Sequence, residues 1–80
     1  IIHFQYTIRR YFMIKEKRNL KHYTQEDMAE KLGISLRQYV RIDNEQAFPR
    51  RDILSKLISE LELTNEEIGK YIKILTGNIA

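Results

Sequence analysis

The sequence contains no cysteine, and it has only three glycines and one proline in 80 residues. Without cysteine, disulfides and thiolate chemistry are excluded. No apolar run approaches the roughly 18 residues of a membrane span, and no signal-peptide pattern is present. We therefore expect a soluble, cytoplasmic protein with no membrane partner.

Signatures of catalysis are also absent. The chain has no glycine-rich phosphate loop, no His-Glu-x-x-His and no Gly-x-Ser-x-Gly. His22 has no second histidine or cysteine at ligand spacing, so no metal site is expected. Eighty residues form at most one domain, and its core is too small for a deep cleft. We predict a single domain over residues 1–80, with residues 1–7 as an N-terminal extension, that is not an enzyme and needs no cofactor.

The charge that is present is unevenly distributed along the chain. Residues 1–51 contain 11 Lys and Arg against 6 Asp and Glu, whereas residues 52–80 contain 3 against 5. A basic first part and a mildly acidic last part suit a surface that faces a polyanion and a separate packing or partner surface. Charge alone fits an ordinary solvated surface equally well.

Apolar residues recur at helical spacing, and no strong strand pattern is found. Helices are predicted at about 8–21, 25–32, 36–44, 51–61 and 65–75. We expect Thr7 to cap the first helix, whose non-apolar side is basic and includes Arg18. The sequence therefore predicts an all-α fold.

Three helix starts have a capping-box pattern, in which a hydroxyl and a residue three positions later exchange hydrogen bonds with the backbone. These are Thr24 with Asp27, Ser35 with Gln38, and Thr64 with Glu67. Gly33 can adopt the positive φ that closes a helix. Two capped helices around one glycine predict a helix-turn-helix at about 25–44.

The pattern also predicts which residues of this region face inward. Met28, Ala29 and Leu32 form one buried stripe, and Tyr39 and Ile42 face the core. Phe48 is expected to fill the core beneath the loop that ends at Pro49. The outward face of the second helix then carries Leu36, Arg37, Val40, Arg41 and Asn44.

An outward helix face of this composition suits the major groove of DNA. Arg37 and Arg41 stand one turn apart, and arginine can donate two bonds to guanine. Leu36 and Val40 can touch thymine methyl groups. Contacts to the phosphate backbone are expected from Gln25 at a helix start and from Asn44, Arg50 and Arg51. The alternative is a solvated helix face.

Several stretches together resemble a known family from Ile14 to about Ile72. They are Arg18, Thr24–Glu26, Met28–Ser35, Arg41–Asp43, Pro49 and the pair Leu54 and Leu57. The chain resembles the Cro/C1-type (XRE-type) helix-turn-helix family of phage and bacterial repressors. The resemblance implies a compact five-helix, lambda-repressor-like domain that usually acts as a dimer on a two-fold operator. It also implies base reading by Leu36, Arg37 and Arg41, and backbone contacts from Gln25, Val40, Asn44 and neighbours such as Ser35.

Four positions depart from the family pattern. Leu36 stands where a polar base-reading residue is frequent, and Tyr39 replaces a smaller aliphatic residue and needs a partner for its hydroxyl. Glu45 replaces the usual glycine and brings negative charge near the expected phosphate path. His22 also occupies a place where glycine is common, which predicts a strained or reshaped turn.

Two hypotheses for function follow. The first is a sequence-specific double-stranded DNA-binding transcriptional regulator, a repressor that acts as a homodimer on a palindromic operator. The alternative is a protein-interaction module of the same fold, such as an antitoxin or anti-repressor component that binds a toxin or co-regulator. Dimer contacts are expected from residues 1–7 or from Tyr71, Ile72, Leu75 and Ile79. Tyr71, Ile72 and Leu75 can equally complete the core.

Overall fold

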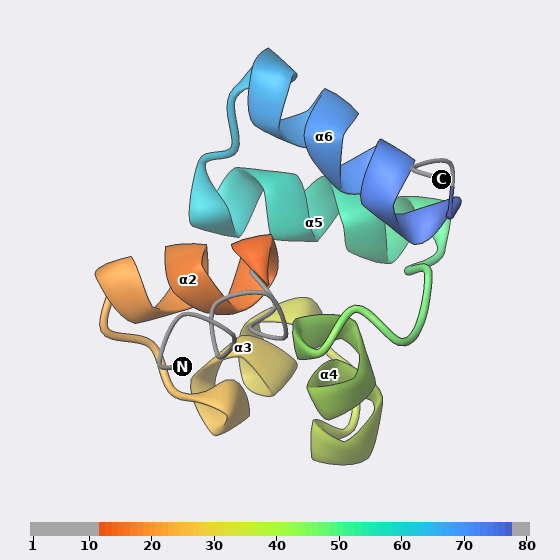
Figure 1. Cartoon of the computed structure of the whole chain (residues 1–80). Coiled ribbons are helices and arrows are strands. Elements are labelled where there is room, and N and C mark those ends of the chain that lie inside the picture. The colour runs from red at the N-terminus through yellow and green to blue at the C-terminus, as the bar shows by residue number, and fades with distance from the viewer. Residues whose placement is uncertain (1–11, 78–80) are drawn as a thin grey trace, which may run out of the picture.

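The computed structural model describes residues 12–77, which form five helices and no strand. The helices are α2 (Met13–Leu20), α3 (Gln25–Leu32), α4 (Leu36–Asp43), α5 (Arg51–Leu61) and α6 (Asn65–Leu75) (Figure 1). The predicted all-α class is confirmed. The proposed extension over residues 1–7 and its Thr7 cap lie outside the described residues.

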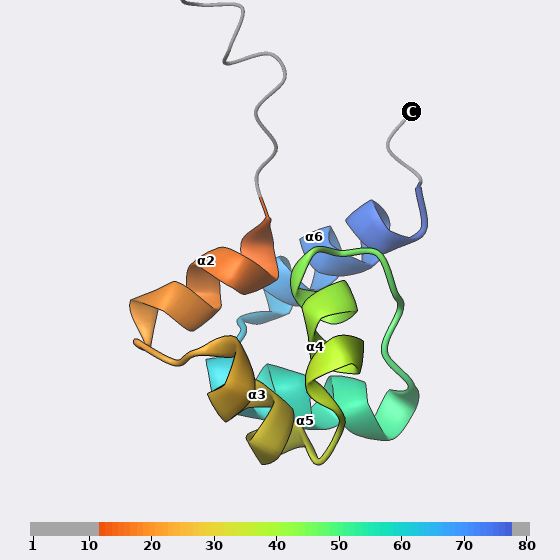
Figure 2. The same cartoon turned by 90° about the horizontal axis from the view of Figure 1, so that it is seen from below.

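Helix α5 runs across the middle of the molecule, with α6 on one side and α2, α3 and α4 on the other (Figure 1). Helices α3 and α4 pack against each other, and both α2 and α3 also contact α5. Figure 2 shows α3 and α4 side by side, joined by the tight turn at Gly33. The predicted helix-turn-helix is therefore present.

The core collects apolar side chains from all five helices. As predicted, Met28, Ala29 and Leu32 of α3 are buried, and so are Tyr39 and Ile42 of α4. The remaining core residues are Met13, Ile14, Ile53, Leu57, Leu61, Leu63 and Tyr71. Tyr71 is fully buried, which places it in the core rather than on a dimer surface.

All three predicted capping boxes form. In the first, the Asp27 N–H donates to Thr24 Oγ1 and the Thr24 N–H donates to Asp27 Oδ2, each at 2.9 Å. The same reciprocal bonds begin α4 and α6. Gly33 has φ 72°, the left-handed conformation predicted for it. These local signals fix the starts of three helices and the turn between α3 and α4.

Among residues 12–77, three residues other than glycine adopt a left-handed backbone: His22, Glu45 and Glu62, with φ between 53° and 60°. Each stands one or two residues after the last residue of a helix. His22 therefore keeps the turn that a glycine would make, at the steric cost that a Cβ atom brings to this conformation.

Two predictions about the first helix and the long loop are wrong. The predicted first helix does not run unbroken from about Ile8 to Lys21, because Phe12 is extended and α2 begins at Met13, whose N–H donates to the Glu45 carboxylate at 2.9 Å. The predicted start near Ile8 lies outside the described residues. Phe48 does not fill the core and is 52% exposed. Its neighbours take that place, since Pro49 is buried and Ala47 packs against the core.

Candidate nucleic-acid interface

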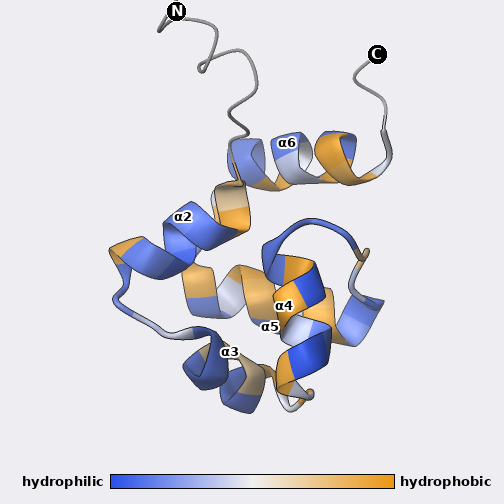
Figure 3. Cartoon of the chain, turned by 60° about the horizontal axis from the view of Figure 1, so that its bottom comes forward, coloured by the Kyte–Doolittle hydropathy of each residue, from blue (hydrophilic) through white to orange (hydrophobic). Residues whose placement is uncertain are grey.

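Helix α4 presents the three residues expected to read bases. Leu36 is 42% exposed, and Arg37 and Arg41 are also exposed. Val40 and Asn44 lie on the same side of the helix and are half-buried. Figure 3 shows hydrophilic and hydrophobic residues alternating on α4, whereas the outer surface of α3 is mainly hydrophilic. The structure thus gathers these five residues on one helix, as expected.

The residues expected to contact the phosphate backbone are less uniform. Arg50 and Arg51 are exposed where α5 begins, and Arg50 lies 3.4 Å from the Asp52 carboxylate. The Ser35 hydroxyl accepts from the Gln38 N–H at the start of α4, so it already serves as a cap. Gln25, the first residue of α3, is half-buried.

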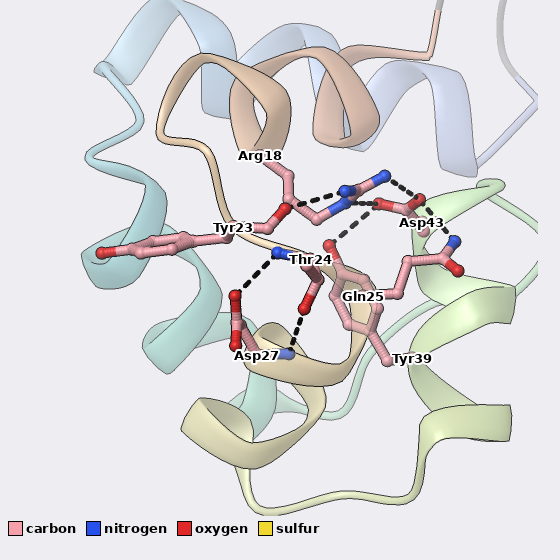
Figure 4. A network of polar contacts seen from close by, with 7 residues as sticks. All are labelled: Arg18, Tyr23, Thr24, Gln25, Asp27, Tyr39 and Asp43. Atoms are coloured by element: carbon pink, nitrogen blue, oxygen red, sulfur yellow. Dashed lines mark hydrogen bonds and ion pairs between the residues drawn. The ribbon is translucent and has the colours of Figure 1, made fainter.

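The Gln25 side chain is held from within the protein. Its amide Nε2 donates to Asp43 Oδ2 at 3.0 Å (Figure 4). A carboxylate only accepts hydrogen bonds when ionised, so the nitrogen of this amide must face Asp43. The interaction fixes the orientation of Gln25 and joins the first turn of α3 to the last residue of α4.

Asp43 is the centre of a buried network that ties three helices together. Arg18 of α2 donates to both of its carboxylate oxygens at 3.0 Å, from Nε and Nη2 (Figure 4). The Tyr39 hydroxyl donates to Oδ1 at 2.9 Å, which supplies the partner that the tyrosine was expected to need. Arg18 also donates to the Tyr23 carbonyl oxygen at 2.9 Å. Asp43 is fully buried and therefore depends on all these donors.

The pKa shifts of Arg18 and Tyr39 favour the protonated forms that donate to Asp43. The hydrogen bond with Asp43 raises the pKa of the Arg18 guanidinium above its ordinary value. Burial, and then the Asp43 charge, raise the pKa of Tyr39 well above 10, so its hydroxyl stays protonated as a donor. Arg18, assigned from the sequence to the basic, non-apolar side of the first helix, is only 8% exposed, so that side of α2 does not face solvent throughout.

Sequence reasoning did not find this network. Arg18 and Asp43 stand 25 positions apart, so no local pattern connects them. One signal was present: Tyr39 and Asp43 are four residues apart on the inward side of one helix, where such pairs meet. A buried tyrosine with a carboxylate one turn later indicates a polar core site.

Glu45 also differs from expectation. Its carboxylate accepts from the Met13 N–H at the start of α2. Burial of the Tyr71 side chain in α6 raises its pKa, and the charge of the Glu45 carboxylate raises it further. The negative charge of Glu45 therefore caps α2, where the helix dipole favours an anion. Its effect on DNA contact stays a prediction.

The basic residues that the structure describes form two groups: some are paired with carboxylates, and others, beside α4, are not. Lys17 pairs with Glu67 at 3.0 Å, and Lys21 pairs with Glu62 at 2.8 Å. Glu62, just after α5, and Glu67, in the first turn of α6, therefore engage a basic residue of α2 and the basic residue that follows it. Within residues 12–77, the exposed Arg37, Arg41 and Arg51 make no ion pair. Positive charge consequently remains available beside α4.

Other kinds of site find no support in the part of the chain that the structure describes. No group of three His, Asp or Glu side chains there is arranged to hold a metal ion. None of the helices in that part is long and apolar enough to cross a membrane.

One of three comparisons with known proteins found a match. Searches of curated proteins and of solved structures found no significant match to the chain. A family model for the helix-turn-helix matches residues 14–68, a stretch that contains α2 from its second residue, α3 to α5 and the first turn of α6. That family comprises DNA-binding regulatory domains rather than enzymes. The chain therefore belongs to the Cro/C1-type (XRE) helix-turn-helix family.

Proposed function

We propose that the chain is a sequence-specific DNA-binding domain that acts as a transcriptional repressor, with α4 as its recognition helix. One observation supports this most strongly. Arg37 and Arg41 are exposed on one face of α4, one turn apart, while the inward face of the same helix is locked by Asp43. A helix held this rigidly can present base-reading side chains in fixed positions.

The proposed roles follow from side-chain chemistry. Arg37 and Arg41 donate to guanine O6 and N7 in the major groove, and Leu36 contacts thymine methyl groups. Gln25, Ser35, Val40 and Asn44 face the phosphate backbone through amide or main-chain groups. Arg50 and Arg51 meet the backbone again where α5 begins. Phosphate contacts position the domain, while α4 reads the sequence.

Repression at a palindromic operator requires a dimer, which we place at α6. Ile72, Ile74 and Leu75 are half-buried there, and Leu75 also packs against the core that contains Tyr71. The proposed contribution of Ile79 lies outside the described residues. A dimer should hold its two recognition helices roughly 34 Å apart, one turn of DNA.

Selection of binding sites from a random pool of DNA duplexes tests this function. We expect an enriched palindrome whose half-sites are about one helical turn apart, and an affinity that falls steeply with salt as counterions are released. Enrichment of no sequence would contradict sequence-specific binding. Enrichment of a single half-site would retain the reader but contradict the dimer.

A second function is favoured by the apolar residues beside the arginines. Leu36 and Phe48 are exposed, which suits a protein partner such as a toxin or co-regulator. In that case the domain is an antitoxin or anti-repressor component. A gel shift at low and moderate salt separates the two functions. No retardation at either salt concentration, together with a stable complex with a protein partner, would support the interaction module.

A further inference from the structure

An open groove of about 330 Å³ lies beside the recognition helix, between α4, the loop that follows it and the start of α5. The nearly buried Ile42 and Ile53 line its depth, with Ile34 from the turn and Ala47 from the loop. The outward orientation of Phe48, which was expected to fill the core, places an aromatic ring at its rim. The groove therefore has aliphatic side chains at its depth and an exposed aromatic edge, and polar atoms make up about half of its surface.

Two arginines complete the rim. Arg41 and Arg50 both line the groove and are exposed. Arg41 makes no ion pair within residues 12–77, and Arg50 has only the exposed Asp52 at 3.4 Å. Two guanidinium groups beside an apolar hollow are complementary to an apolar side chain that is flanked by carboxylates.

The volume limits the occupant. Pockets for small molecules span roughly 300–1,000 Å³, so this groove lies at the lower limit. It has room for one large apolar side chain rather than for a bulky cofactor. Aromatic side chains that enter such hollows dominate the binding energy of many protein interfaces.

We propose that this groove binds a short acidic segment of a partner protein, with one aromatic side chain inserted between Ile42 and Ile53 and carboxylates on Arg41 and Arg50. A DNA backbone fits less well because hydrated sugars and phosphates gain little from an aliphatic interior. Since Arg41 is also a proposed base reader, an occupied groove removes that side chain from DNA. The groove is thus a site at which a protein partner displaces the operator.

The test uses a defined peptide, Asp-Asp-Trp-Asp-Asp, blocked at both ends. The protein itself contains no tryptophan, so the emission of the peptide reports binding directly. We expect a blue shift on addition of the protein at moderate salt, and backbone NMR shifts at Ala47 and Phe48. The same peptide with alanine in place of tryptophan should not bind, because charge alone does not fill the groove.

Substitutions in the protein complete the test. Arg50→Ala should weaken peptide binding about tenfold or more, as expected for the loss of a charge-assisted bond. Ala47→Leu should weaken it by filling the groove, with circular dichroism as the control for folding. Lys70→Ala removes one positive charge from the exposed surface of α6 and should leave peptide binding unchanged.

Three results would overturn the proposal: equal binding of both peptides, equal binding by the parent and Arg50→Ala, or shifts at Ala47 and Phe48 with DNA but not with peptide. The last result assigns the groove to the DNA interface. Peptide binding is measured without DNA, so its failure is distinguishable from a failure of the proposed repressor function.

Discussion

The inward side of α4 is buried and its polar groups are paired, whereas the charged side chains on its outward side are exposed and unpaired within residues 12–77. On the inward side, Tyr39 and Asp43 are fully buried, and every polar atom of the Asp43 carboxylate has a donor. On the outward side, Arg37 and Arg41 are exposed and make no ion pair within residues 12–77. The same eight-residue helix thus separates stability from recognition. Changes on one side should affect folding, and changes on the other should affect DNA binding.

The largest effect is expected from Asp43→Ala. It leaves the Arg18 guanidinium buried without a counter-charge, so the free energy of unfolding should fall by about 3–5 kcal/mol. Tyr39→Phe removes only one donor to the carboxylate and should lower it by about 1 kcal/mol. Urea denaturation followed by circular dichroism measures both. If Asp43→Ala unfolds at the same urea concentration as Tyr39→Phe, Asp43 is not the centre of the network.

On the outward side, Arg37→Ala and Arg41→Ala should each weaken binding to the selected operator by about 1–3 kcal/mol. Because both side chains are exposed, the free energy of unfolding should change by no more than about 0.5 kcal/mol. Fluorescence anisotropy with labelled duplexes measures affinity, and Lys70→Ala is the matched control for the loss of one charge. Equal losses on cognate and random DNA would assign these arginines to the backbone.

A smaller effect is expected at the turn before α3. His22 has φ 60°, a conformation that disfavours residues with a Cβ atom, so His22→Gly should stabilise the protein by up to about 1 kcal/mol. Gly33→Ala is the converse control. Its Cβ would have space, but φ 72° makes it strained, and a loss of about 1–2 kcal/mol is expected. A lower thermal midpoint for His22→Gly would show that His22 makes contacts that outweigh the strain.

The smallest effect concerns pH. The Thr64 N–H, and then Lys17, hold the pKa of Glu67 below its ordinary value of 4.5. The ionised carboxylate therefore contributes stability above about pH 4.5, and this contribution is lost as the pH falls through the lower folded-state pKa. Denaturation midpoints of Glu67→Gln and the parent should differ at neutral pH and converge in acid. Glu66→Gln, on the same turn, is the control, and a difference that persists unchanged in acid would contradict the linkage.

Local signals predicted much of this fold. The capping boxes at Thr24, Ser35 and Thr64, and the left-handed turn at Gly33, act within four residues. Helical periodicity then placed the apolar stripe of α3 in the core. These features succeed because the sequence carries both partners of each interaction within one turn.

What sequence reasoning missed depends on distant partners. The Arg18–Asp43 pair spans 25 positions, and the bond from Met13 to Glu45 spans 32. Glu45 was expected to bring negative charge near the phosphate path. Its carboxylate binds the Met13 N–H at the start of α2, and no residue close to Glu45 in the sequence indicates that partner. Phe48 faces outward because Ala47 and Pro49 occupy the core side of the loop. The outward residues of α4 were placed correctly, while their roles on DNA stay predictions.

Backbone NMR shifts on titration with the selected operator test most directly whether the outward side of α4 reads DNA. The two-sided account predicts the largest shifts at Leu36, Arg37 and Arg41, with smaller shifts at Gln25 and Asn44. The backbone shifts of exposed residues of α6 such as Lys70 should stay unchanged. Shifts concentrated on α6, with none on α4, would contradict the account.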